Sequence, residues 1–447
     1  MKDLTKGNSG RLIIEFAIPI CIGSIFQLFY SLVDTRIVGQ TLGDAALAAV
    51  GATSTMNNLI IGFLSGLTSG FSVWVARDFG AHKEDEMRKD IAATLVLGSI
   101  IGFVLTLLSV SFLTQILGWI NIPTDLMADG MNYVRIILMG MMITMLYNLC
   151  ANVLRAIGDT ITPLCFLIVS TLANIGLDYY FILRLHQGVK GAAYATVIAQ
   201  GFSVVMCLIY IWRKYPILHL SPTDFKLKAS RIQTLLASGI SMGLMNSLVS
   251  IGTVTLQGAI NQLGTLTIVA HTGARKLTEV LMMPFGAIST TMATYCSQNL
   301  GAKQYKRIKE GIHKGVWMSW IWCGMVVLIS YTIAPQLIQI ITATQSQEVI
   351  DTASLYLKID TLFYFVVVVV CIYRNALQGL GDHMTPIISS AIELVGKVLV
   401  VIFLTPRLHY MGVIWAEPIV WILMVIPLII KMFTFPILKN AQYEQTS

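Results

Sequence analysis

Charged residues are scarce in this chain. Asp, Glu, Lys and Arg make up 12% of its 447 residues, 55% are hydrophobic, and the mean hydropathy is +0.74. Soluble domains carry about 25% charged residues, so this composition excludes a soluble fold. Runs long enough to cross about 30 Å of hydrocarbon recur and predict an all-α integral membrane protein with twelve transmembrane helices. The runs lie near 11–33, 46–76, 91–117, 131–155, 162–184, 191–212, 233–261, 267–297, 313–334, 353–378, 385–405 and 411–431.

Several motifs that carry chemistry are also missing. The sequence has no G-x-x-x-x-G-K-[ST] loop and no H-E-x-x-H run, which excludes a P-loop ATPase and a zincin protease. A membrane-embedded transferase that binds Mg²⁺ would need close i,i+4 acid pairs, and the runs lack them. The 7 cysteines are an odd number and lie in apolar runs, so we expect packing thiols without a disulfide framework. We expect neither an enzyme nor a bound cofactor.

The Lys and Arg residues are unevenly distributed. A net charge of +7 alone is typical of nucleic-acid-binding proteins as well, but the positions of the charges indicate membrane topology instead. Of the 30 Lys and Arg, 21 fall on the side that holds both termini, 4 on the other side and 5 inside the runs. By the positive-inside rule, both termini of this multi-pass chain should be cytoplasmic in a cell (inner) membrane.

The second half of the sequence repeats the first. NVLRAIGDTITP (152–163) aligns with NALQGLGDHMTP (375–386) at an offset of 223 residues. This predicts an amino-terminal lobe of six helices (1–212), a cytoplasmic linker (213–232) and a carboxy-terminal lobe of six helices (233–447). Six spans return the chain to its starting side, so the lobes should be related by pseudo-twofold symmetry about the membrane normal. Duplicated halves of this kind build alternating access, although an old duplication without transport consequence is the alternative.

Two carboxylates stand out inside the first half. Asp34 lies in FYSLVDTRIVG and Asp178 in ANIGLDYYFI, each near the predicted outer end of its span. Tyr30 and Asn174 come four residues before them, a spacing that places each pair on one helix face. Thr196 adds a hydroxyl on the sixth span. Such an oxygen-rich cluster can hold Na⁺ or share a proton.

Simpler interpretations of these residues stay open. Asp34 can be a solvated interfacial carboxylate or a partner of Arg36, although the two side chains point to different faces. Asp178 has no nearby cation in the sequence. Pro19 removes a backbone hydrogen bond from the first helix and should kink it; the kink is either static or a bend that ion binding controls.

The second half differs at the matching positions. FYSLVD (29–34) aligns with MNSLVS (245–250), which places Ser250 at the position of Asp34, and the offset of 223 places Lys397 at the position of Asn174. Glu393 precedes Lys397 by four residues, the favourable order for a helical ion pair, and Glu417 aligns with Thr196. These residues form either a structural ion pair or a functional polar site.

Glu279 is a third acid of the second half, in RKLTEVLMMPFG. It either binds a cationic substrate or pairs with Arg275 or Lys276. The sequence leaves both interpretations open.

The order and spacing of several motifs resemble one known family. FYSLVDTRIVGQTLGDAALAAVG, LRAIGDTITP, NIGLD and GAAYATVIAQ look like the multidrug and toxic compound extrusion (MATE) family, and most like its DinF-type bacterial and archaeal branch. Members are cation-coupled efflux antiporters. The resemblance implies a cation site in the amino lobe and a bending point in the first helix. These map onto Asp34, Asn174, Asp178 and Thr196, with Tyr30 beside them and Pro19 as the bend. The carboxy lobe departs from the family at Ser250 and Lys397.

The expected function is a membrane antiporter. It would export amphipathic, cationic organic compounds or drugs while H⁺ or Na⁺ enters, in the bilayer, as a monomer and without a nucleic-acid partner. The alternative is a flippase for lipid-linked saccharides, which should line its cavity with several cations and carry extra spans. The sequence does not choose between H⁺ and Na⁺.

Overall fold

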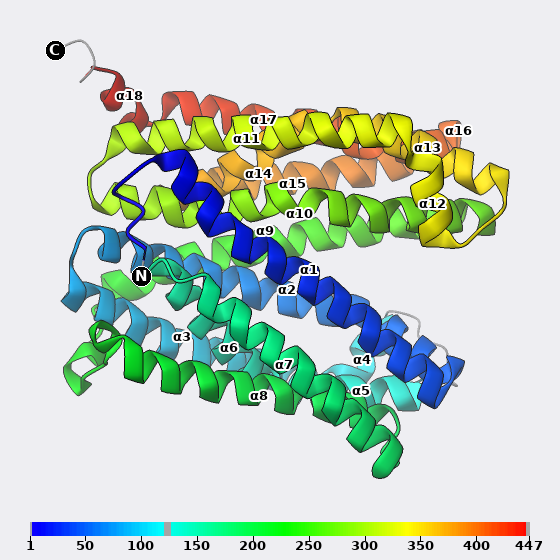
Figure 1. Ribbon diagram of the computed structural model, residues 1–447, viewed down its shortest axis with the longest axis horizontal. Helices are drawn as coiled ribbons and strands as arrows, with labels where there is room; N and C mark the ends of the chain where they lie inside the picture. Colours follow the sequence, from blue (N-terminus) through cyan, green and yellow to red (C-terminus); the bar gives the residue numbers. More distant parts are fainter. Residues whose placement is uncertain (1, 120–126, 444–447) are drawn as a thin grey trace. The chain divides into compact units, whose positions relative to one another are not determined.

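The computed structural model describes residues 2–119 and 127–443, and this part of the chain contains helices, turns and loops but no strand (Figure 1). The predicted all-α membrane fold is confirmed. The first half contains α1 (Ser9–Leu42), α2 (Asp44–Gly80), α3 (Glu84–Ser111), α4 (Leu113–Trp119), α5 (Met127–Met139), α6 (Met141–Ala156), α7 (Ile161–Tyr179), η1 (Tyr180–Arg184), α8 (Val189–Lys214), η2 (Pro216–Leu218) and η3 (Pro222–Phe225). The second half contains α9 (Ala229–Ile260), α10 (Thr265–Gly301), α11 (Tyr305–Thr332), α12 (Ala334–Thr342), α13 (Gln347–Leu362), α14 (Tyr364–Gly379), α15 (Met384–Leu399), η4 (Val400–Leu404), α16 (Thr405–Leu408), α17 (Tyr410–Thr434) and α18 (Pro436–Tyr443).

Most of these helices are long and apolar enough to cross a bilayer. In the described part of the chain, 9 single helices qualify, and two bent pairs, α5 with α6 and α13 with α14, raise the number to 11. The remaining predicted span falls on α10, which has 37 residues but includes His271, Arg275, Lys276 and Glu279.

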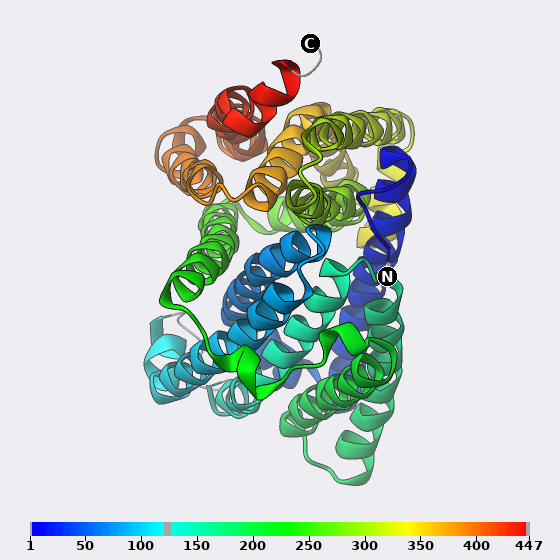
Figure 2. The ribbon, with the colours of Figure 1, turned by 90° about the vertical axis from the view of Figure 1, so that its left-hand side faces the viewer.

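The chain divides into two compact units. The amino lobe contains residues 2–3 and Ile22–Gly243, and the carboxy lobe contains Leu4–Cys21 and the chain from Leu244 onward. Helices α1 and α9 are each divided between the units, which the repeat did not indicate. Between α8 and α9 the chain forms η2 and η3, which contact α3 and α8 of the amino lobe (Figure 2). The predicted boundaries at 212 and 233 stay a prediction.

The repeated Gly-Asp motif turns the chain and caps a helix in each lobe. Gly158 and Gly381 have φ of +85° and +90°, a conformation that glycine adopts without strain. Asp159 accepts hydrogen bonds from the Thr162 backbone N–H (3.0 Å) and hydroxyl (2.6 Å) at the start of α7. Burial opposes ionisation of Asp159, but the hydrogen bonds from Thr162 and Tyr215 outweigh it and lower the pKa of this carboxyl. The motif that revealed the repeat is therefore structural.

Both lobes bend at the same place in the repeat. The α5–α6 pair turns by 46° and the α13–α14 pair by 53°, and the residues at the two breaks, Gly140 and Phe363, are 223 positions apart. A Cβ atom on Gly140 would lie 2.4 Å from Val197 Cγ2. The glycine thus lets the bend pack closely on α8, next to Thr196.

A π-helical segment follows each of the polar positions on α7 and α15. Asp178 lies in the last turn of α7, just before the π-helix η1, and Lys397 lies in the last turn of α15, just before the π-helix η4. Short π segments inside helices occur frequently at functional sites. The sequence pattern gave no sign of these segments.

Candidate functional site

The two carboxyl groups of the amino lobe lie together. Asp34 comes from α1, and Asp178, which is fully buried, comes from α7. The two carboxyl groups interact directly and are close enough to share a proton through a hydrogen bond. The Oδ1 atom of each is buried and has no hydrogen-bond partner in the described part of the chain. The structure therefore brings the predicted pair together, and the described residues show no ion pair between Asp34 and Arg36.

Neutral polar groups surround this pair. With its amide oriented to satisfy both ends, Asn174 donates to Asp178 Oδ2 (3.0 Å) and accepts from the Thr196 backbone N–H (3.1 Å). The Tyr30 hydroxyl lies 3.4 Å from Thr196 Oγ1. The Thr196 hydroxyl donates to the Ala192 carbonyl (3.1 Å). Hydrogen bonds thus connect three of the predicted residues, Tyr30, Thr196 and Asn174, to Asp178, with the Thr196 backbone N–H as one link.

Tyr133 is a neighbour that the sequence analysis missed. It lies on α5, is 9% exposed, and interacts electrostatically with both Asp34 and Asp178. The repeat aligns it with Tyr356 of the carboxy lobe, also at an offset of 223. A comparison of aromatic positions between the halves would have identified it.

The arrangement can hold one small cation or a proton. Each of the two carboxyl groups has a buried Oδ1 that accepts no hydrogen bond. Keeping both groups ionised and unpaired would carry a large desolvation cost. A proton shared between them, or a Na⁺ ion held with amide and hydroxyl oxygens, removes that cost. Among the described residues no group of three or more His, Cys, Asp or Glu could hold a metal ion, so any ion here relies on two carboxylates and neutral oxygens. Helix α1 continues through Pro19, and its predicted kink stays a prediction.

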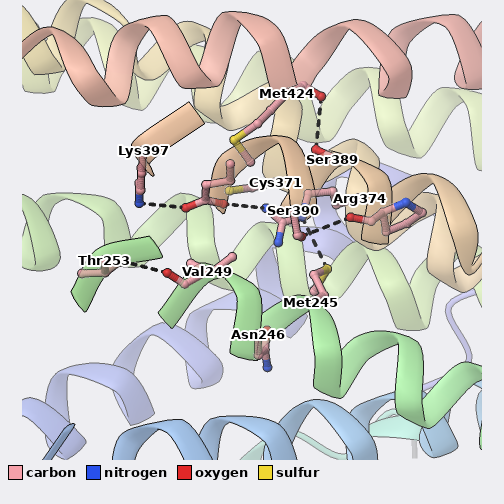
Figure 3. A network of polar contacts seen from close by, with 12 residues as sticks. Met245, Asn246, Val249, Thr253, Cys371, Arg374, Ser389, Ser390, Lys397 and Met424 are labelled. Carbon is pink, nitrogen blue, oxygen red and sulfur yellow. Dashed lines mark hydrogen bonds and ion pairs between the residues drawn. The ribbon is translucent and has the colours of Figure 1, made fainter. Parts of the chain in front are cut away.

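The carboxy lobe holds a chain of alternating charges instead. Lys397 Nζ lies 2.9 Å from Glu393 Oε1 and 3.2 Å from Glu417 Oε1. Arg374 on α14 lies 3.6 Å from Glu393 Oε2, and Arg275 on α10 lies 3.8 Å from Glu417 Oε1. Figure 3 shows the surroundings of Lys397 and Arg374, where Arg374 Nε donates to Met245 Sδ (3.4 Å). The predicted pairs of Lys397 are both present, and Arg275 pairs with Glu417 and not with Glu279.

Three more residues of the carboxy lobe bear on its charges. Arg374, one of the 21 Lys and Arg counted on the side that holds the termini, is buried in α14, where Glu393 balances its charge. Asp360 was missed; it is 1% exposed, and neither of its carboxyl oxygens has a hydrogen-bond partner among the described residues. Its position inside a predicted span was a usable signal. Glu279 is exposed and makes no ion pair in the described part of the chain.

Comparison with known proteins identifies the family. The MatE family model matches the chain twice, at residues 19–180 and 241–403, so the two matches start 222 and end 223 residues apart, as the repeat requires. "Probable multidrug resistance protein YoeA" of Bacillus subtilis is 26% identical over 91% of this chain and 88% of its own. "FAD transporter" of Shewanella oneidensis is 24% identical over 95% of each.

Solved structures show the same fold. "Crystal structure of MATE in complex with MaL6" superposes with a TM-score of 0.88 at 21% identity, covering 98% of this chain and 99% of that one. The family is one of transporters, so the protein is not an enzyme. With both halves matched by the same family model and the fold shared over nearly its full length, this multi-pass membrane protein belongs to the MatE (MATE) family of transporters.

Proposed function

We propose that this protein is an inner-membrane antiporter that exports amphipathic, cationic organic compounds while H⁺ or Na⁺ enters. The coupling ion is the sole cofactor. Both termini are cytoplasmic, as the distribution of Lys and Arg favours. A monomer suffices for this function, since one chain supplies both lobes.

The paired carboxyl groups of the amino lobe carry the proposal. Asp34 and Asp178 are two acids within membrane spans, and each has an Oδ1 without a hydrogen-bond partner among the described residues. In a merely structural site, a lysine or arginine of the protein would pair with these oxygen atoms, as Lys397 pairs with Glu393 in the carboxy lobe. An ion that arrives and leaves is therefore the partner that fits the amino lobe.

Coupling requires that ion and substrate stabilise different conformations. Ion binding neutralises the Asp34–Asp178 pair and removes the repulsion between them. The resulting conformation of α1, bent at Pro19, has low affinity for substrate and releases it outward. Loss of the ion to the cytoplasm restores the conformation that accepts substrate.

The substrate class follows from the relatives and from charge. YoeA is named a probable multidrug resistance protein, whereas another relative is named an FAD transporter. We propose cationic substrates for this chain because the ionised acid pair of the amino lobe favours a positive ligand in the ion-free state. A lipid-linked saccharide, the substrate of a flippase, needs free cations for its pyrophosphate. Arg275, Arg374 and Lys397 each already face a carboxylate.

Transport by purified protein in liposomes tests the proposal. Ethidium should accumulate against its gradient when an inward H⁺ or Na⁺ gradient is imposed, and Asp34→Asn and Asp178→Asn should each abolish this. Asp129→Asn is the matched control, because Asp129 is an exposed acid of the same lobe. Uphill transport at the wild-type rate by either site variant would refute the coupling. Competition by FAD, with none by ethidium-like cations, would refute the substrate class.

A further inference from the structure

We propose that Glu393 and Glu417 form a cation site in the carboxy lobe and that the ammonium group of Lys397 permanently occupies it. The comparison with an exchangeable ion rests on the proposed function of the amino lobe. The experiment below, in contrast, measures cation binding in the carboxy lobe without transport.

The lysine occupies the position that an ion would take. Its side chain is 2% exposed, and both glutamates are 5% exposed. Its ammonium group contacts one oxygen of each glutamate, at 2.9 Å and 3.2 Å. The two carboxylates come from different helices, α15 and α17. Lys397 thus bridges two helices as a bound cation would, but a covalent stem holds it in place.

The internal repeat identifies this as the counterpart of the amino-lobe site. Lys397 corresponds to Asn174 at the offset of 223 residues, and Glu417 aligns with Thr196 at an offset of 221, with Gly412 matched to Gly191. Each lobe has a π-helical segment after these positions: Lys397 lies three residues before η4, and Asn174 lies six residues before η1. Ser250 replaces the third member, Asp34, and its hydroxyl donates to the Asn246 carbonyl of its own helix (2.9 Å). The second copy therefore keeps the place but replaces the acid pair and the free ion with a lysine between two glutamates.

The neighbouring helix leaves space for the lysine stem. A Cβ atom on Gly252 of α9 would lie 3.1 Å from Lys397 Cδ and 3.6 Å from the Leu394 Cα. Because that distance to Cδ is shorter than ordinary van der Waals contact, a side chain at residue 252 would displace the stem. Gly252 is thus a positioning residue that helps hold the ammonium group between its two partners.

The arginines at the ends do not fill the same place. Arg374 and Arg275 approach the glutamates at 3.6 Å and 3.8 Å, longer than the two lysine contacts. Three cations and two glutamates leave one positive charge, and Asp360, the nearby acid that interacts with this chain of charges, can balance it. Removing the lysine therefore leaves two glutamates with distant partners and a space of lysine size between them.

A consequence for coupling follows. An ammonium group on a covalent stem cannot leave, so Glu393 and Glu417 exchange no free metal cation during the transport cycle. Lys397 instead ties α15 to α17 in every conformation in which the glutamates stay within its reach.

Chemical rescue tests the inference. The background is Asp34→Asn/Asp178→Asn, which removes the amino-lobe site, and the readout is the thermal unfolding midpoint, Tm, in detergent. Lys397→Ala should lower the Tm of the background by several degrees and create a site for a small cation. Methylammonium chloride should then raise the Tm in a saturable manner, whereas choline chloride at the same concentration, whose cation is too large for the space, should not. The background with Lys397 intact should respond equally to both salts.

Lys397→Met is the matched control, since it removes the same charge but fills the space with an apolar chain of similar length. It should lower the Tm without any rescue by methylammonium. Equal responses of the Ala and Met variants, or no response of Lys397→Ala because the arginines move onto the glutamates, would overturn the inference. If Lys397→Ala fails to fold, binding of ²²Na⁺ to the background protein is the test. The inference predicts no saturable binding, since saturable binding with Lys397 intact contradicts a permanently filled site. None of these outcomes depends on transport, so a failure here leaves the proposed function standing.

Discussion

The amide of Asn174 should control how tightly the amino lobe holds its ion. This side chain is 2% exposed and donates to Asp178 Oδ2 at 3.0 Å. Its oxygen is already engaged by the Thr196 backbone N–H at 3.1 Å. The substitution Asn174→Ala removes the hydrogen bond that stabilises the ionised form of Asp178.

The magnitude follows from the chemistry of that hydrogen bond. A hydrogen bond to a charged group contributes about 1.5–3 kcal/mol, which corresponds to roughly a 10- to 150-fold change in a binding constant. For a proton, loss of the donor favours the neutral carboxyl, so the site should bind H⁺ roughly 10- to 150-fold more tightly. Na⁺ binds only the ionised carboxylates, so the tighter hold of Asp178 on a proton opposes Na⁺ binding and weakens it. The direction of the change therefore distinguishes the two ions.

The assay is ethidium efflux from proteoliposomes as a function of external pH and, separately, of external Na⁺. A proton-coupled protein carrying Asn174→Ala should reach half-maximal efflux at a pH about 1–2 units higher than the wild type. A sodium-coupled one should need more Na⁺.

Asn152→Ala is the control, because Asn152 is also a buried amide of this lobe but donates to Thr68 Oγ1 (3.0 Å). Both variants lose a buried hydrogen bond, and only Asn174→Ala should change the ion dependence. If Asn174→Ala leaves the dependence on both ions as in the wild type, the amide is not part of the ion site and the reasoning is refuted.

Three further predictions concern the scaffold. Gly158→Ala should lower the Tm more than Gly381→Ala. Both substitutions impose about 1 kcal/mol of strain at positive φ, but only at Gly158 would the new Cβ lie 2.0 Å from a backbone oxygen. Equal losses of Tm in thermal melts would count against this. Asp159→Ala should cost about 1 kcal/mol at pH 7 as a lost helix cap. Because the folded-state pKa of Asp159 is lowered, its contribution is present above the unfolded value and lost as pH falls through the folded pKa, so the difference from wild type in melts from pH 7 to pH 3 should shrink below about pH 4. Pro19→Ala restores a backbone donor inside α1 and should slow ethidium efflux while leaving ion binding in detergent unchanged; an unchanged efflux rate would make Pro19 a passive kink.

The membrane fold was predictable because its physics is carried by composition. Apolar runs of about 20 residues can only be helices in a bilayer, and the repeat around Gly158 and Gly381 gave the duplication. The same spacing placed Tyr30 with Asp34 and Asn174 with Asp178, since neighbours four apart share a helix face. The contact between α1 and α7 does not follow from this spacing, which relates residues of one helix only.

Contacts between helices distant in sequence were the main limit. The charge count gave Arg374 a side of the membrane but no partner, because its partner Glu393 lies on another helix. Asp360 went unnoticed among apolar neighbours, and the closeness of Tyr133 to the acid pair involves three helices, α1, α5 and α7. These features require tertiary packing, which neither hydropathy nor charge counting reports.

Competition between ion and substrate can be measured as ion release on substrate binding in detergent, where no gradient exists. Ethidium added to the wild-type protein in weakly buffered solution should release about one H⁺ per molecule, read with a pH indicator, or about one Na⁺, read with a sodium electrode. Asp34→Asn and Asp178→Asn should bind ethidium without releasing either ion. Ethidium binding to the wild type without release of H⁺ or Na⁺, or undiminished release from both variants, would contradict the claim that substrate and ion compete through this pair.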